Sequence, residues 1–256
     1  MGYDFQPFSL IDAPDSAAII FCHGCYLKCQ YCYNLNLLED GGMSIHELIP
    51  KIKELKQINS NTGKSFNTVN WLVFTGGEPL IQNNFLDLQY LIEIAKDIGL
   101  KIALYTNGIN FKLLKHFVED SLIDMLHIDY KHLYYNRVSK LDVFGDVYHS
   151  IDIAFENFLR ERIKYLYFNT VIAKSLIDIE DLIKMKYLLF AITTKIPIIK
   201  EDYFAHKIAW KITPFYNNFN KIPTYKILDY ETNNFSEEEI NNIIETLRSK
   251  NEKEPT

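Results

Sequence analysis

Three cysteines near the amino end of the chain have a spacing that could hold a metal cluster. Cys25, Cys29 and Cys32 are separated by three residues and then by two, in a chain with four cysteines among 256 residues. Soft thiolate ligands hold iron–sulfur clusters, and thiols this close in sequence can reach three corners of one cube. A [4Fe–4S] cluster has four irons, so three protein ligands leave one iron open. The spacing therefore predicts a cluster with a free position for a substrate or cofactor.

The fourth cysteine, Cys22, allows a second interpretation of the same segment. Cys22 and Cys25 could pair with Cys29 and Cys32 as a zinc site, so a zinc or iron–sulfur binding module without catalysis is an alternative. Two such pairs usually need a spacer of roughly 12–20 residues to fold around one zinc, whereas the spacer here is three residues. Cys22 also ends the apolar run 17–22, which favours a small buried side chain or a role beside the cluster.

Short apolar runs alternate with helical patterns along the chain, which is typical of a parallel sheet covered by helices. The predicted strands are Ala17–Cys22, Trp71–Thr75, Lys101–Thr106, Met125–Asp129, Tyr165–Ile172 and Ala209–Phe215. The first predicted helix follows a capping box at Ser44, with a kink or restart at Pro50. Further predicted helices span 84–98, 111–119, 148–163 and 176–189, and a last one capped by Ser236 reaches about Arg248. Predicted loops span 57–68, 136–146 and 196–207. This pattern predicts an α/β fold, an open (β/α)6 barrel.

Parallel α/β folds bind ligands at the carboxyl ends of their strands, and polar residues follow two of the predicted strands there. The second strand continues into Gly76, Gly77 and Glu78. Two glycines would let backbone groups approach a ligand closely, and the carboxylate would suit a ligand ammonium. The third strand continues into Asn107 and Gly108. A tight turn without a ligand is the alternative interpretation for both segments.

The fourth predicted strand carries three ionisable side chains on one face. His127, Asp129 and Lys131 alternate along the strand, and alternate residues of a strand point to the same side. Burying these groups without partners would be costly, and a polar ligand at the open end of a barrel would relieve that cost. A surface ion pair at the strand end is the alternative, and His127 is interpreted as a structural histidine.

The cysteine triplet resembles the Cys-x-x-x-Cys-x-x-Cys signature of the radical S-adenosylmethionine enzymes. Within that superfamily the chain is similar to the activating enzymes of glycyl radical proteins, especially those paired with anaerobic ribonucleotide reductase. The segments Asp4–Pro14 and Phe21–Asn34 look like the opening segment and the cluster loop of that group. The likeness covers residues 4–135 and fades toward the C-terminus. It also implies a partial (β/α)6 barrel.

The resemblance implies a set of cofactors and site residues. The three cysteines would hold a [4Fe–4S] cluster, and S-adenosyl-L-methionine would bind the open iron through its amine and carboxylate. The residues that would bind this cofactor are Tyr31, Gly76, Gly77, Glu78, Asn107, Asp129 and Lys131. Ordinary loop packing is the alternative for Tyr31. Cleavage of the cofactor would give a 5′-deoxyadenosyl radical that takes hydrogen from a glycine of a partner enzyme. The electron would come from a donor such as flavodoxin or ferredoxin.

Departures from the family pattern leave other functions open. Tyr105 stands where many activating enzymes have an aspartate, which puts a cation site in question. The fifth strand carries Phe168-Asn169-Thr170 where related enzymes often have an arginine-containing run, so a carboxylate clamp would have to come from elsewhere. A radical enzyme acting on a small molecule, resembling 7-carboxy-7-deazaguanine synthase, is an alternative to the activating function.

Composition narrows the class of protein further. The chain is 48% hydrophobic and carries a formal net charge of −6 without a dense run of Lys or Arg, which argues against a nucleic-acid surface. We find no signal-peptide pattern and no run of about 18 apolar residues, and we expect a cytoplasmic protein without a membrane span and with free thiols. We expect a core domain over residues 1–230, followed by a C-terminal helix and polar tail over 231–256.

Overall fold

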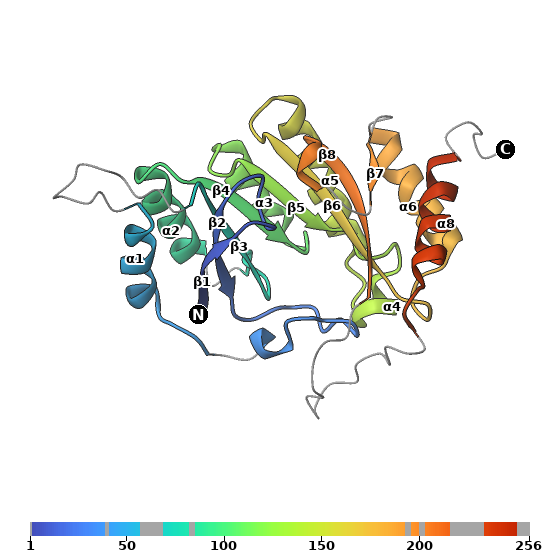
Figure 1. The fold of residues 1–256 in the computed structure, drawn as a ribbon, viewed down its shortest axis with the longest axis horizontal. Helices are drawn as coiled ribbons and strands as arrows, with labels where there is room; N and C mark the ends of the chain where they lie inside the picture. The colour runs from blue at the N-terminus through green and yellow to red at the C-terminus, as the bar shows by residue number, and fades with distance from the viewer. Residues whose placement is uncertain are drawn as a thin grey trace.

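The fold is organised around one sheet, which the computed structural model shows in side view in Figure 1. The structure describes residues 2–38, 41–56, 69–81, 85–192, 196–199, 203–215 and 233–249. Within these ranges the strand order is β1-β2-β3-β4-β5-β6-β8-β7, and β1 and β7 form the two unpaired edges. The strands are β1 Tyr3–Ser9, β2 Ala17–Cys22, β3 Trp71–Gly76, β4 Lys101–Thr106, β5 Met125–Asp129, β6 Tyr165–Ile172, β7 Ile198–Ile199 and β8 Ile208–Pro214. All neighbours pair in parallel except β1 and β2. The edge strands β1 and β7 do not pair with each other in the described ranges, so the barrel is open, as predicted.

The helices follow the strands in the order that a parallel sheet requires. They are α1 Ile45–Glu54, α2 Phe85–Asp97, α3 Phe111–Glu119, α4 Tyr135–Ser139, α5 Phe144–Leu159, α6 Ile179–Ile192 and α8 Glu237–Ser249, with short 3₁₀ turns at Leu35–Leu38 and Tyr203–Ala205. The capping box at Ser44 is confirmed, because its side chain and that of Glu47 bond each other's backbone N–H. Pro50 lies inside α1 without ending it, so the predicted restart is wrong.

Two edge strands and parts of three helices differ from the prediction. β1 and β7 were not predicted, and β7 lies within the predicted loop 196–207. α4 begins one residue before the predicted loop 136–146 and continues into it, and α6 is shifted by three residues toward the C-terminus. α5 begins and ends four residues earlier than predicted. Its early end follows from Glu161, which adopts a left-handed φ of 59° and whose N–H bonds the oxygen of Phe158. The predicted loop 57–68 and residues 251–256 lie outside the described residues.

Two apolar layers fill the two sides of the sheet. The layer between the sheet and the helices contains most of the core, whereas a smaller layer lies on the inner face of the barrel. The smaller layer includes Ala17, Trp71, Val73, Ala103, Met125, Tyr167 and Ala209. These residues occupy the amino-terminal halves of their strands, so the polar residues of the same face are left for the carboxyl ends.

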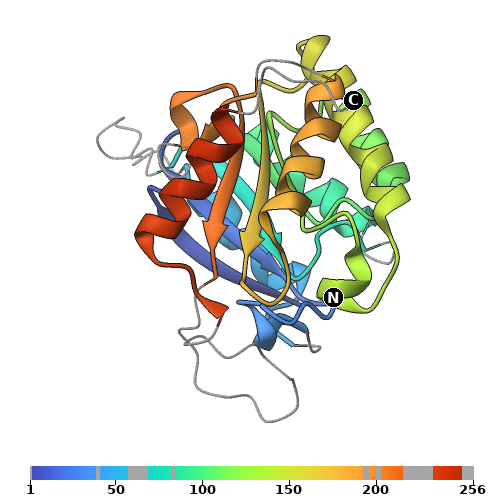
Figure 2. The same ribbon diagram turned by 90° about the vertical axis from the view of Figure 1, so that its right-hand side faces the viewer.

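The C-terminal helix belongs to the wall of the barrel. α8 packs against α6 and β7, and it buries Ile240, Ile244 and Leu247. Figure 2 shows α8 and α6 flanking β8 and β6, whose arrowheads point toward the edge where the amino-terminal segment runs. The boundary at residue 230 stays a prediction, since residues 216–232 lie outside the described residues.

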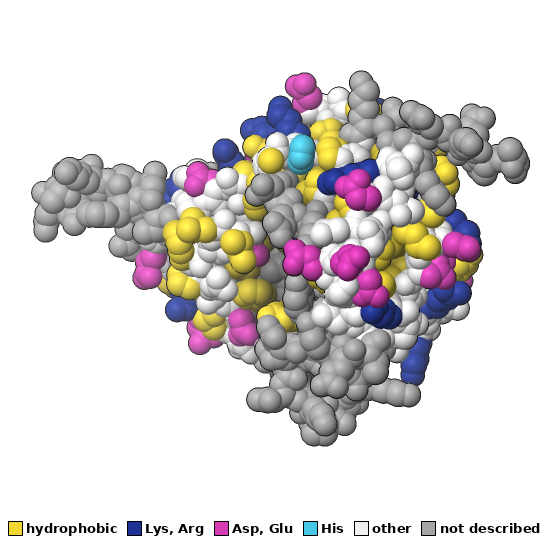
Figure 3. All heavy atoms as spheres, turned by 45° about the vertical axis from the view of Figure 1, so that its right-hand side comes forward, with side chains coloured by type: hydrophobic (Ala, Val, Ile, Leu, Met, Phe, Trp, Pro, Cys, Tyr) yellow, Lys and Arg dark blue, Asp and Glu magenta, His cyan; other side chains and the backbone are white. Residues whose placement is uncertain are grey.

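On the face seen in Figure 3, acidic and basic side chains are interspersed.

Candidate functional site

The three cysteines of the triplet line one pocket at the carboxyl ends of the strands. The loop that follows β2 brings Cys25, Cys29 and Cys32 together around a pocket of about 160 Å³, and all three thiols are free. The other lining residues are Leu27, Tyr31, Tyr33, Asn34, Leu38, Gly76, Gly77, Asn107, Asp129, Lys131, Asn169 and Val171. Of the ten residues proposed from the sequence, this pocket therefore gathers all but Glu78.

Cys22 lies apart from this pocket. It is the last residue of β2, it is 1% exposed and it packs in the core beside Tyr3, as a buried small side chain would. No group of three or more His, Cys, Asp or Glu in the described ranges could hold a metal ion by itself. The four cysteines therefore do not converge as a zinc site requires. The thiols of an iron–sulfur cube bind separate irons, so they need not meet at one point.

Gly76 and Gly77 let the end of β3 pack directly on the cysteine loop. A Cβ on Gly77 would lie 2.0 Å from the oxygen of Gly24, and one on Gly76 would lie 2.6 Å from the nitrogen of Cys22. The backbone of the two segments is joined by bonds from Gly77 N to Cys22 O and from Glu78 N to Gly24 O, both 2.8 Å. The two glycines are therefore required for the close packing of β3 against the cysteine loop, whether or not a ligand is bound.

Glu78 points away from the pocket into a set of hydrogen bonds. Its Oε1 accepts from Leu80 N at 2.9 Å and from Thr106 Oγ1 at 2.6 Å, and its Oε2 accepts from Asn107 N at 2.7 Å. Burial raises the pKa of Glu78 to about 7, although these three donors favour the charged form. The carboxylate thus joins the loop after β3 to the end of β4. Its predicted contact with a ligand ammonium stays a prediction.

Asn107 contacts a cluster-loop thiol directly. Its Nδ2 donates to Cys25 Sγ over 3.8 Å, while its Oδ1 accepts from Ile109 N at 3.0 Å. The second bond orients the amide so that the nitrogen faces the sulfur. Glu78 holds the backbone of the same residue, and Asn107 is therefore fixed from two sides.

Asp129 and Lys131 form an ion pair at the pocket, next to Tyr31. Lys131 Nζ lies 2.8 Å from Asp129 Oδ2 and 5.9 Å from the centre of the Tyr31 ring. Burial raises the pKa of Asp129, but Lys131 and His127 outweigh it, so the pKa lies below its usual value. The Tyr31 hydroxyl is buried without a hydrogen-bond partner among the described residues, which leaves it available to a ligand.

His127 lies one layer deeper inside the barrel. Its ring centre is 4.2 Å from that of Tyr105, whose hydroxyl donates to the oxygen of Asp12 at 2.8 Å. Burial lowers the pKa of His127 to about 4, so the ring is neutral near pH 7. The structural role predicted for His127 agrees with this position. Tyr105 is directed at a backbone oxygen rather than at the pocket.

The thiols fit an iron–sulfur cluster as its ligands. Burial raises the pKa of Cys25 to about 12 and that of Cys29 to about 11, and it also raises the pKa of Cys32. Thiols in such a site are protonated unless a cation compensates the thiolate charge. Iron supplies that charge, and Lys131 adds to it for all three sulfurs.

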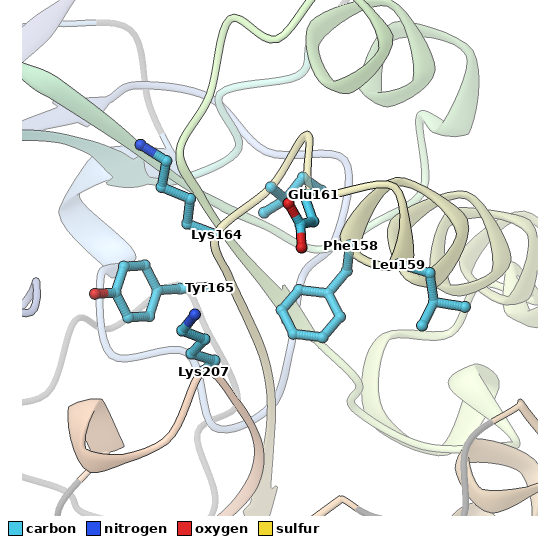
Figure 4. A pocket seen from close by; sticks show the side chains of 7 residues that line it. Phe158, Leu159, Glu161, Lys164, Tyr165 and Lys207 are labelled. Carbon is cyan, nitrogen blue, oxygen red and sulfur yellow. The ribbon is translucent and has the colours of Figure 1, made fainter.

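A larger hollow of about 490 Å³ lies at the opposite ends of the strands (Figure 4). Phe158 and Leu159 from the end of α5, Glu161, Ile163 and Lys164 from the turn that follows, Tyr165 and Lys207 line it. It contains none of the residues that the sequence singled out, and its lysines are exposed side chains. Size alone therefore does not identify the site.

Two asparagines of the pocket, Asn34 and Asn169, were not among the predicted site residues. Asn34 Nδ2 donates to Gly76 O at 3.4 Å, and Asn169 pairs with Asp129 in the register of β5 and β6. Strand alternation could have identified Asn169, because it shares the inner face with Tyr167 and Val171 near the end of β6. Asn34 carries no such signal, since it lies in an irregular loop.

The comparisons with known proteins agree with this geometry. Residues 14–137 match the family described as "4Fe-4S single cluster domain". The chain is 33% identical over 129 residues to a proposed glycyl-radical enzyme activating enzyme of Methanocaldococcus jannaschii, covering 48% of this chain and 47% of that protein. It is 28% identical over 134 residues to the pyruvate formate-lyase-activating enzyme of Clostridium pasteurianum, covering 50% and 52%. The chain thus spans about half the length of the curated relatives it matches.

A solved structure shares the fold. The structure of TYW1 with a lysine-pyruvate adduct bound superposes with a TM-score of 0.58 at 14% sequence identity, covering 91% of this chain and 73% of that one. Fold and site together define an open, mostly parallel α/β barrel with three free thiols around one pocket, and the segment that carries them matches a single-cluster 4Fe-4S domain.

These matches agree with the resemblance to the radical S-adenosylmethionine superfamily, and over about half of its length the chain is similar to activating enzymes of glycyl radical enzymes. The matched family is described by a single 4Fe-4S cluster, and the similarity to these activating enzymes supports a [4Fe–4S] cluster used with S-adenosyl-L-methionine. None of the helices in the described ranges has the length and apolar character that crossing a membrane requires.

Proposed function

We propose that this chain generates a glycyl radical on a partner enzyme, such as anaerobic ribonucleotide reductase, with a flavodoxin or ferredoxin as electron donor. Together, the bound cluster and S-adenosylmethionine supply a 5′-deoxyadenosyl radical by one-electron cleavage of the sulfonium. The observation that carries the proposal is the convergence of three free thiols of one loop with the polar ends of β4 and β5 on one pocket.

The chain's own residues bind and orient the two cofactors. Cys25, Cys29 and Cys32 hold the cluster, and the bond from Asn107 Nδ2 to Cys25 Sγ withdraws charge from that sulfur. The Lys131 ammonium suits a ligand carboxylate, and the Asp129 carboxylate accepts hydrogen bonds from ligand hydroxyl or ammonium groups. Glu78 acts in this proposal through Asn107, whose backbone it fixes.

A glycine of a partner protein is a suitable hydrogen donor for this site. Removal of a hydrogen atom from a Cα needs no general base, and His127, two residues before Asp129 on β5, is neutral and buried. The relatives named as activating enzymes support a protein partner more than they support the small-molecule alternative.

Cofactor cleavage tests the first half of the proposal. The protein is reconstituted with iron and sulfide under anaerobic conditions and reduced with S-adenosylmethionine, and 5′-deoxyadenosine is measured. We expect Cys29→Ala to abolish its formation and Cys22→Ala, which removes a thiol outside the pocket, to retain it. Equal cleavage by Cys29→Ala and the unmodified protein would exclude the assigned cluster site.

Electron paramagnetic resonance tests the second half. The reduced protein is mixed with each glycyl radical enzyme encoded in the same genome, and we expect a glycyl radical in one of them. Sustained turnover of a small molecule without a protein partner would instead support the alternative that resembles 7-carboxy-7-deazaguanine synthase.

A further inference from the structure

Asn169 on β6 lies between Asp129 on β5 and Thr213 on β8. Asn169 is the register partner of Asp129, and Val171, two residues further along β6, is the partner of Thr213. Asp129, Asn169 and Val171 all line the cysteine pocket. The carboxylate, the amide and the hydroxyl therefore form one row across three strands at the carboxyl end of the barrel.

The polar groups of this row can pair in only one arrangement of donors and acceptors. Thr213 Oγ1 lies 2.6 Å from Asn169 Oδ1, and the Asn169 side chain is one of the neighbouring groups that lower the pKa of Asp129, its register partner. An ionised carboxylate can only accept, so the Asn169 amide must present its nitrogen to Asp129. Its oxygen then faces Thr213, whose hydroxyl must donate. Thr213 thus holds the amide in the orientation that the Asp129 carboxylate requires.

The other neighbours of Asp129 hold it less well once a cofactor is bound. Lys131 pairs with Asp129 at 2.8 Å, but it is also the cation that a ligand carboxylate would draw away. His127 Nε2 lies 3.7 Å from Asp129 Oδ1, which is too far for a hydrogen bond. Asn169 is the neighbour that is fixed by another strand and has no competing role in the proposed function.

We propose that Thr213 and Asn169 are positioning residues that hold Asp129 in its cofactor-binding orientation when Lys131 turns to the cofactor. This inference rests on the proposed function, because it assigns Asp129 to S-adenosylmethionine. Neither residue needs to touch the reacting atoms. Their effect is on cofactor affinity, while the chemical step at saturation is left unchanged.

A matched pair of substitutions at Thr213 tests the inference. Thr213→Val keeps the shape but removes the donor, so the Asn169 oxygen loses its partner and the amide is held less firmly against Asp129, whereas Thr213→Ser keeps the hydroxyl. We expect Thr213→Val to raise the Kd for S-adenosylhomocysteine by about five-fold or more in calorimetric titrations of the cluster-loaded protein. We expect Thr213→Ser to bind as the unmodified protein does, and kcat at saturating S-adenosylmethionine to stay within about two-fold in both.

A second variant keeps the inference testable if Thr213→Val unfolds. Asn169→Asp retains the size of the side chain but places a second carboxylate against Asp129, and we expect it to raise the same Kd by about ten-fold or more. Equal Kd values for Thr213→Val and Thr213→Ser, with equal melting temperatures, would overturn the positioning role and leave the proposed function standing. An unmodified, cluster-loaded protein that binds no S-adenosylhomocysteine would refute both.

Discussion

Gln30 in the cysteine loop donates a hydrogen bond from its side-chain Nε2 to the backbone oxygen of Arg137 in α4, over 2.7 Å. The Gln30 backbone N–H also donates to Val138 O at 3.1 Å. Arg137 Nη1 in turn lies 3.0 Å from Asp181 Oδ2 on α6. The stretch between Cys29 and Cys32 is therefore attached to α4 and, through Arg137, to the wall of the barrel.

Gln30→Ala should loosen the cysteine loop without unfolding the protein. Loss of one side-chain hydrogen bond costs about 0.5–1.5 kcal/mol, which would raise hydrogen exchange of the loop amides by about two-fold to ten-fold. Exchange over residues 25–32 of the cluster-free protein, followed by mass spectrometry, measures this. Gln89→Ala is the control, because Gln89 makes a comparable exposed bond to Glu93 on α2 at 2.9 Å. Unchanged exchange in Gln30→Ala would contradict the attachment.

Gly77→Ala should prevent the cysteine loop from closing on β3. The new Cβ would lie 2.0 Å from the backbone oxygen of Gly24, so one of the two segments must move. We expect a loss of roughly 3 kcal/mol in the free energy of unfolding, together with reduced iron content after reconstitution. At Gly145, in the first turn of α5, an added Cβ meets nothing within 4 Å. Gly145→Ala should therefore raise stability by about 0.5–1 kcal/mol. Similar melting temperatures for the two variants would refute the close packing.

Glu78 should make the protein less stable as the pH rises from about 4.5 to about 7. Its pKa is about 7 in the folded chain against an ordinary value of 4.5, so the folded state holds a proton that the unfolded state has lost. At about 1.36 kcal/mol for each pH unit, the loss is roughly 3 kcal/mol. Urea unfolding of the cluster-free protein and of Glu78→Gln measures it. The stability advantage of the unmodified protein over the variant should shrink across this range, and a constant difference would show that burial does not control Glu78.

The contribution of His127 to stability should change with pH in the opposite direction to that of Glu78. Its pKa is about 4 in the folded chain against 6.5 ordinarily, so the unfolded state takes up a proton first and stability falls as the pH drops from about 6.5 to about 4. The loss is again roughly 3 kcal/mol. Between about pH 4.5 and 6.5 the contributions of His127 and Glu78 should nearly cancel. His127→Gln should therefore gain stability on acidification through this range relative to the unmodified protein, and parallel urea-unfolding profiles for the two would contradict the assignment.

Local patterns were sufficient for most of the sheet. The predicted bounds of β4, β5 and β6 agree with the structure, because a strand buried on both faces is a continuous apolar run between turn residues. The edge strands β1 and β7 were not predicted because they lack such a continuous apolar run. β1 has an alternating pattern with Pro7 at an edge position, and β7 has two residues, so their pairing depends on the neighbouring strand.

Helix ends can also be predicted from the sequence only in some cases. α5 ends where the backbone of Glu161 and Arg162 bonds back to Phe158 and Asn157, and the sequence has no glycine there to indicate it. α3, in contrast, has the predicted bounds, and the side chain of Asn110 caps it by accepting from Leu113 N. A cap formed by a side chain can be predicted from residue types, whereas a cap formed by backbone alone is decided by packing.

The amino-acid sequence by itself determined the cysteine spacing, the strands and the polar residues at their ends, because these follow from residue types a few positions apart. Tertiary structure alone decided how those polar groups are used. Glu78 turns to the backbone of Asn107, 29 residues away, and Asn169 joins Asp129 to a threonine 44 residues further along the chain. Such partners are set by the order and register of paired strands, and long-range pairing of this kind leaves no pattern within a short window of sequence.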